Sequence, residues 1–166
     1  MSNDPGKADP HPDRTDIVPI VPPSDSGKAR DQADLRTDWL LQYLVSLVRN
    51  SPMEFGITLQ VSGMLVSGQL VSHKTYFEGL AIALSEGLEK FPDLADTFKT
   101  GIASFGVTPA NIESNVDIPM PQFIHLKNAK LINTAGHDIP RGAGVWWRGR
   151  ISEVGGFILG TFSESS

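Results

Sequence analysis

The chain has 166 residues, a formal net charge of −5 and no cysteine. Once the polar start is set aside, about 130 residues remain, which is room for one domain and not for two. The lack of cysteine excludes a disulfide framework, thiolate metal ligands and a cysteine nucleophile. The acidic balance argues against non-specific nucleic-acid binding. Only the segment 122–166, with five basic and three acidic residues, has a positive balance and can present a basic face.

Residues 1–36 are predicted to form a disordered tail rich in Pro and Asp. Their one apolar stretch, 17–21, is interrupted and flanked by proline, so the segment buries too little apolar area to offset the entropy of ordering it. The alternative is that residues 17–22 form a short extended docking motif. The polar start does not resemble a secretory signal, and no run approaches the roughly 18 apolar residues of a membrane span. We therefore expect a soluble cytoplasmic protein that makes no membrane contact.

The ordered part is expected to begin with an amphipathic helix. Thr37 or Asp38 can accept a hydrogen bond from the free amides of a first helical turn. Apolar residues then recur at helical spacing for about three turns, up to the stop signal Asn50-Ser51-Pro52. The predicted buried stripe consists of Trp39, Leu40, Tyr43, Leu44, Leu47 and Val48.

A period of two replaces the helical period at Phe55. It predicts strands over 55–61 and 64–70, joined as a hairpin by a turn at Ser62-Gly63. Gly68 lies inside the second strand, where a glycine indicates bending or a close backbone approach. Leu59 is expected to point into the core.

Helical patterns return after Ser72, a suitable cap, and end at Phe91. Pro92 can open a further short helix before Gly101, expected to bury Leu94, Ala95 and Phe98. The segment 102–121 has no clear period and predicts a long loop. The end of the chain predicts strands over 123–126, 129–132, 145–151 and 156–162. The fold class is therefore α+β, with a single domain over 37–163.

No catalytic, metal or cofactor site is predicted. His11, His73, His125 and His137 have no convincing partner for proton transfer, and the pair His137-Asp138 is expected to be solvated. His125 with His137 and Asp138 is the nearest approach to a metal set, but no spacing places two ligands on one element. His125 is expected on the surface. The glycines 142 and 144 precede a strand, whereas a phosphate-binding loop follows one.

The segment 146–150, with sequence WWRGR, is the strongest candidate for a binding surface. Strand alternation places Val145, Trp147 and Ile151 on one face, which is expected to face the core, and Trp146, Arg148 and Arg150 on the other face. Exposed aromatic and arginine side chains are enriched among binding hot spots. The predicted partner-binding residues are Trp146, Arg148, Arg150, His125 and Lys127. The alternative is that a helix covers Trp146 and leaves the arginines solvated.

Two blocks of the sequence resemble a known family. Residues 123–130 (FIHLKNAK), 147–154 (WRGRISEV) and 156–160 are similar to the C-terminal half of gas vesicle accessory protein U (GvpU), and 57–76 resembles its N-terminal half. The match covers roughly 39–162 and is absent from the tail. The resemblance implies a non-catalytic accessory protein that influences gas vesicle assembly or clustering. Its expected partners are the vesicle shell or other gas vesicle proteins, and itself as a homo-oligomer.

The same blocks resemble the Sm-like fold, an N-terminal helix followed by a small, strongly bent antiparallel barrel. Residues 57–63 with Gly68 look like its first motif, and Arg148-Gly149 like the Arg-Gly of its second. The helical stretch 72–101 would then be an insertion. This resemblance implies an alternative function, an RNA-binding module that uses Arg148 and Arg150. The Asp and Asn usual in the RNA pocket have no counterpart between Val71 and Leu80, so nucleic acid is the less favoured partner.

Overall fold

The computed structural model describes residues 37–49, 51–107, 119–134 and 136–162. The predicted tail 1–36, with its proposed docking motif, lies outside the described residues, as does most of the predicted loop 102–121.

Helix α1 (Trp39–Arg49) begins where the sequence predicts. Asp38 Oδ1 accepts hydrogen bonds from the amides of Leu40 and Leu41, at 2.8 and 3.0 Å, and so satisfies donors that the first turn leaves free. The predicted stripe is wrong in part, because the buried side chains are Leu41, Val45 and Val48. Three of the predicted ones are 38–41% exposed: Trp39, Leu40 and Leu47. The helix is apolar on more than one side, so its packing on the sheet selects the buried face.

Strands β1 (Phe55–Val61) and β2 (Met64–Leu70) form the predicted hairpin. Ser62 and Gly63 both have positive φ, 50° and 81°, which tight two-residue turns between antiparallel strands require. The close approach predicted at Gly68 is confirmed. A Cβ there would lie 3.0 Å from the Cα of Ala129, and the register with the next strand shifts at this point.

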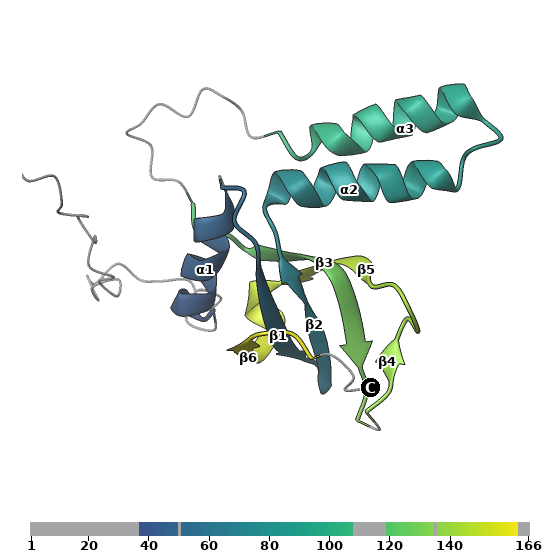
Figure 1. Ribbon diagram of the computed structural model, residues 1–166. Coiled ribbons are helices and arrows are strands. Elements are labelled where there is room, and N and C mark those ends of the chain that lie inside the picture. The colour runs from purple at the N-terminus through teal and green to yellow at the C-terminus, as the bar shows by residue number, and fades with distance from the viewer. Residues whose placement is uncertain (1–36, 50, 108–118, 135, 163–166) are drawn as a thin grey trace, which may run out of the picture.

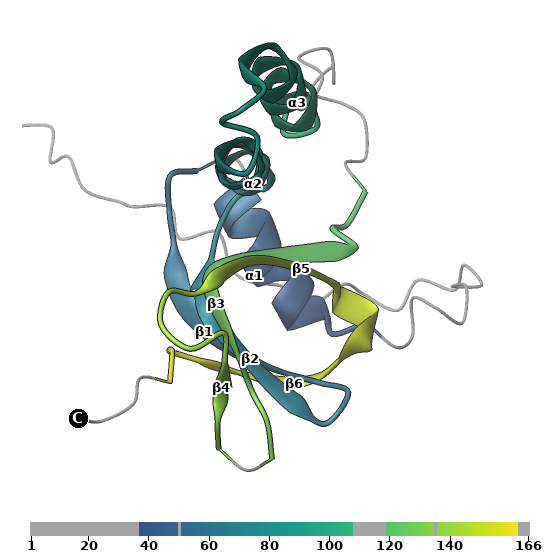
Figure 2. The same cartoon turned by 90° about the vertical axis from the view of Figure 1, so that its right-hand side faces the viewer.

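The other strands are β3 (Phe123–Ile132), β4 (Asp138–Ile139), β5 (Val145–Arg150) and β6 (Val154–Leu159). All pairings are antiparallel, in the order β4-β3-β2-β1-β6, and β5 also pairs with β3. A short 3₁₀ turn, Ile151–Glu153, connects β5 to β6. The sheet bends strongly, as Figure 2 shows. The α+β class is confirmed. No pairing joins β5 to β6 in the described residues, so the sheet is not closed and the Sm-like barrel is not confirmed.

Helix α1 packs against one face of this sheet to form the core. The predicted inward positions Leu59 and Ile151 are confirmed, with exposed fractions of 0% and 1%. The other buried members are Leu41, Val45, Val48, Ile57, Val66, Leu70, Ile124, Leu126 and Ala129. Each large aliphatic side chain removed from water in this way stabilises the fold by about 1.5–3 kcal/mol.

Helices α2 (His73–Glu86) and α3 (Pro92–Ser104) form a helical hairpin inserted between β2 and β3. Ser72 Oγ caps α2 by accepting from the amide of Thr75 at 3.0 Å, and Pro92 opens α3, both as predicted. Helix α2 lies next to the sheet, α3 lies on its far side, and both extend beyond the sheet (Figures 1 and 2). The burial predicted for α3 is wrong, since Leu94 and Phe98 are 45% and 48% exposed. The helix also continues through Gly101 to Ser104, so the predicted end before Gly101 is wrong.

Candidate functional site

The two tryptophans of β5 point in opposite directions, as alternation predicts. Trp147 packs against the core cluster. Trp146 lies against α2, with its ring centroid 6.0 Å from that of Tyr76. Gly79 makes this contact possible, because a Cβ there would lie only 1.9 Å from the indole. The alternative interpretation, in which a helix covers Trp146, is therefore the one that the structure supports. Trp146 joins the hairpin to the sheet, and its predicted role as a partner anchor has no direct support.

Arg148 and Arg150 are exposed on β5 and share one aromatic neighbour. The guanidinium carbon of Arg148 lies 3.5 Å from the ring centroid of Phe123, and that of Arg150 lies 5.6 Å from it. These distances are within the range of cation–π attraction. Neither arginine forms an ion pair with a carboxylate of the described residues. We call the surface formed by these two arginines and the Phe123 ring the arginine face. Its side chains are held by their contacts with the ring, and no carboxylate of the described residues neutralises their charge.

His125 is buried, so the prediction that it lies on the surface is wrong. Only 5% of it is exposed, and the rings of His73, Tyr76 and Phe77 surround it at centroid distances of 5.2, 4.8 and 6.1 Å. Alternation correctly placed it opposite Ile124 and Leu126, but α2 covers that face of β3. Burial, together with the nearby His73 and Arg148, lowers the pKa of His125 to about 3. The structure therefore places His125 beneath α2 and not on the surface, and its role in partner binding stays a prediction.

Lys127, the last predicted partner-binding residue, forms an ion pair with Glu54. Both side chains keep about a third of their surface exposed, and such pairs contribute little to stability. The pairing does, however, offset the charge of Lys127. Of the five predicted partner-binding residues, only Arg148 and Arg150 remain as exposed charges without a carboxylate partner.

The hairpin exposes several large apolar side chains, including Leu94 and Phe98, which were predicted to be buried. Its two helices bury only Tyr76 and Ala81. The exposed set consists of Ile82, Leu84, Phe91, Leu94, Phe98 and Phe105. Leu94 and Phe98 are four residues apart on α3 and so lie on one helical face. The spacing that predicts an amphipathic helix was read correctly, but it cannot say whether the apolar side meets this chain or another protein. We call Leu94 and Phe98 the apolar face of α3.

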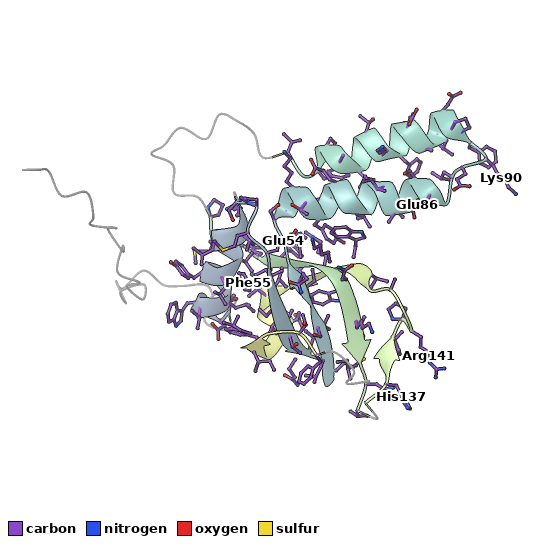
Figure 3. The ribbon with its side chains drawn as sticks, in the orientation of Figure 1. Glu54, Phe55, Glu86, Lys90, His137 and Arg141 are labelled. Carbon is purple, nitrogen blue, oxygen red and sulfur yellow. The ribbon has the colours of Figure 1, made fainter. Side chains whose placement is uncertain are left out.

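No group of three metal-ligating side chains occurs among the described residues. His137 is exposed and lies at the end of the sheet near Arg141, away from the hairpin tip at Glu86 and Lys90 (Figure 3). His11 lies outside the described residues. Within the described ranges, no helix is both long and apolar enough to cross a membrane.

These features define a small α+β protein with a bent antiparallel sheet and a projecting helical hairpin. The chain belongs to the gas vesicle protein GvpU-like family, whose model matches residues 38–162. No curated protein and no solved structure matches it. The predicted resemblance is thus confirmed over nearly the whole of the described region. The protein is gas-vesicle-related, and family membership suggests association with gas vesicle components.

Proposed function

We propose that this protein is a non-catalytic gas vesicle accessory protein that influences vesicle assembly or clustering by binding the vesicle shell, itself, or both. The observation that carries the proposal is the apolar face of α3. Soluble monomers rarely leave large apolar side chains grouped on one surface unless that surface meets a partner. Leu94 and Phe98 are both nearly half exposed, on a helix that buries no residue.

The arginine face is the second element of the proposal. Arg148 and Arg150 have no carboxylate partner among the described residues, on a protein whose net charge is −5. A local positive patch on an acidic protein directs its encounter with acidic surfaces, whereas like charges suppress encounter. The hairpin supplies apolar contact area, and the arginine face supplies orientation.

The RNA-binding alternative is supported by one observation. Arg148 and Arg150 lie exposed on β5, and no carboxylate of the described residues pairs with either of them. Affinity for short single-stranded RNA, measured as a function of salt, tests it. Phosphate contacts weaken steeply as salt rises, whereas apolar contact with a shell does not.

Co-sedimentation with purified gas vesicles tests the main proposal. The double variant Leu94→Gln/Phe98→Gln should lose vesicle association or self-association, because it removes the apolar face of α3 without touching the core. Thr100→Gln, an exposed change on the same helix, is the matched control and should behave as wild type. Association that survives the double variant unchanged would remove the hairpin from the mechanism.

A further inference from the structure

A cavity of about 420 Å³ lies where the end of α1 meets the starts of β3 and α2. Its volume falls within the range of small-molecule sites. Its wall includes Val45 of α1, Val71 just before α2, and Phe123 of β3. This wall is apolar and comes from three separate elements. The cavity therefore depends on the fold as a whole.

The charged side chains among the described residues that line the cavity are all of one sign. Arg49 and Arg148 line it, and its described lining holds no carboxylate. Neither guanidinium pairs with an acidic side chain of the described residues. Arg49 Nη1 donates to the carbonyl oxygen of Pro119 at 3.4 Å, and the Arg148 guanidinium stacks on Phe123. Each guanidinium has five N–H donors, so both retain donors for an anion.

A buried polar atom points to the same conclusion. His125 also lines the cavity, and only 5% of its surface is exposed. Its Nε2 atom has no hydrogen-bond partner among the described residues. Buried polar atoms without partners are rare in native proteins and call for an explanation. His73 does not supply the missing partner, because its own Nε2 lies 2.7 Å from the carbonyl oxygen of Phe105 and must donate to it.

We infer that this cavity binds a small organic anion, with its carboxylate at Arg49 and Arg148 and its apolar body against Val45, Val71 and Phe123. Apolar walls with a few convergent polar groups are the usual form of a ligand site. Two arginines favour a carboxylate because the planar guanidinium matches its two oxygens. The His125 ring is placed to give its unpaired nitrogen a partner when the site is filled. This inference goes beyond the proposed function and does not depend on vesicle binding.

Calorimetric titration of the full chain with octanoate tests the inference. Three compounds serve as comparison ligands. Octanol keeps the apolar body without a charge, octylamine keeps it with a positive charge, and acetate keeps the carboxylate without the apolar body. We expect saturable binding of octanoate and at least about tenfold weaker binding of the other three, because each probe lacks one of the two recognised features. Arg49→Gln and Arg148→Gln should each weaken octanoate binding by about tenfold or more.

Arg141→Gln is the matched control, since Arg141 is an exposed arginine at the opposite end of the sheet (Figure 3). Near-ultraviolet spectra check that each variant is folded. Equal binding of octanoate and octanol would overturn the inference, because the cavity would then recognise only apolar bulk. It would also be overturned if both cavity variants bound octanoate like the Arg141 control. Failure of octanoate alongside binding of a short poly-glutamate peptide would assign the arginines to an acidic protein partner instead.

Discussion

Replacing His125 by Leu should make the protein more resistant to acid. In the folded chain the pKa of His125 is lowered from 6.5 to about 3, first by burial and then by the nearby His73 and Arg148. Unfolding exposes the ring and restores its ordinary pKa. Between about pH 6.5 and pH 3 the unfolded chain therefore binds a proton that the folded chain does not. The free energy of unfolding therefore falls as the pH decreases through this window. Above the window, His125 adds nothing to its pH dependence.

The size of the effect follows from the width of that window. One pKa unit corresponds to about 1.4 kcal/mol. At pH 4 the unfolded-state ring is about 2.5 units below its own pKa, while the folded-state ring is still neutral. The His125 contribution to the loss of unfolding free energy between pH 7 and pH 4 is thus about 3 kcal/mol. The titratable and charged groups that face the ring among the described residues are His73 and Tyr76 from α2 and Arg148 from β5, and none of them is a carboxylate that could pair with a protonated ring.

Denaturant unfolding at pH 7 and pH 4 measures this difference directly. Carboxyl groups also titrate in this range, so the quantity compared is the pH-dependent loss in wild type minus that in His125→Leu. His137→Gln is the control, because His137 is exposed and should leave the loss unchanged (Figure 3). If leucine impairs folding, His125→Gln provides the same comparison with a polar side chain. A His125 variant that loses as much stability as wild type would refute the burial argument.

Three further predictions concern the core, the contact between Gly79 and Trp146, and the arginine face. Leu59→Ala and Ile151→Ala should each lower the unfolding free energy by about 2–5 kcal/mol in denaturant titrations, because both side chains are fully buried; a wild-type midpoint for either would contradict their placement. Gly79→Ala should lower the free energy of unfolding by about 1–3 kcal/mol, because its Cβ would overlap the Trp146 indole. In a Trp146→Ala background the same change should raise it, because only the better helix propensity of alanine remains. A change in unfolding free energy of the same sign in both backgrounds would rule out the contact. Arg148→Glu/Arg150→Glu should abolish vesicle association or self-association at a nearly unchanged melting temperature; a folded variant that still co-sediments would exclude the arginine face.

Local signals were sufficient for most of the fold. Asp38 and Ser72 each placed a helix start because a cap depends on atoms within three residues. Ser62-Gly63 placed the hairpin because its turn demands positive φ at both positions. These features depend on short stretches of backbone, which a single sequence contains in full.

The errors arose where burial depends on distant elements. Helix α1 has apolar residues on several sides, so its sequence cannot say that Leu41 faces the sheet and Leu40 does not. His125 was placed on the correct face of β3, but the cover over that face comes from α2, about fifty residues earlier in the chain. In the candidate site, Arg148 and Arg150 were predicted by strand parity. The docking of Trp146 against Gly79 required the position of the hairpin.

The position of Trp146 connects the two surfaces of the proposed function. Its indole rests on α2 at Gly79, while its strand neighbours carry the arginine face, so this side chain acts together with the packing of α2 on His125 to hold the hairpin against the sheet. In Figure 2, α2 lies between α3 and the sheet. If a partner must meet the apolar face of α3 and the arginine face together, it requires this contact even though it need not touch Trp146. Trp146 was predicted to contact the partner itself. In this proposal it contributes to binding by positioning the residues that make the contact.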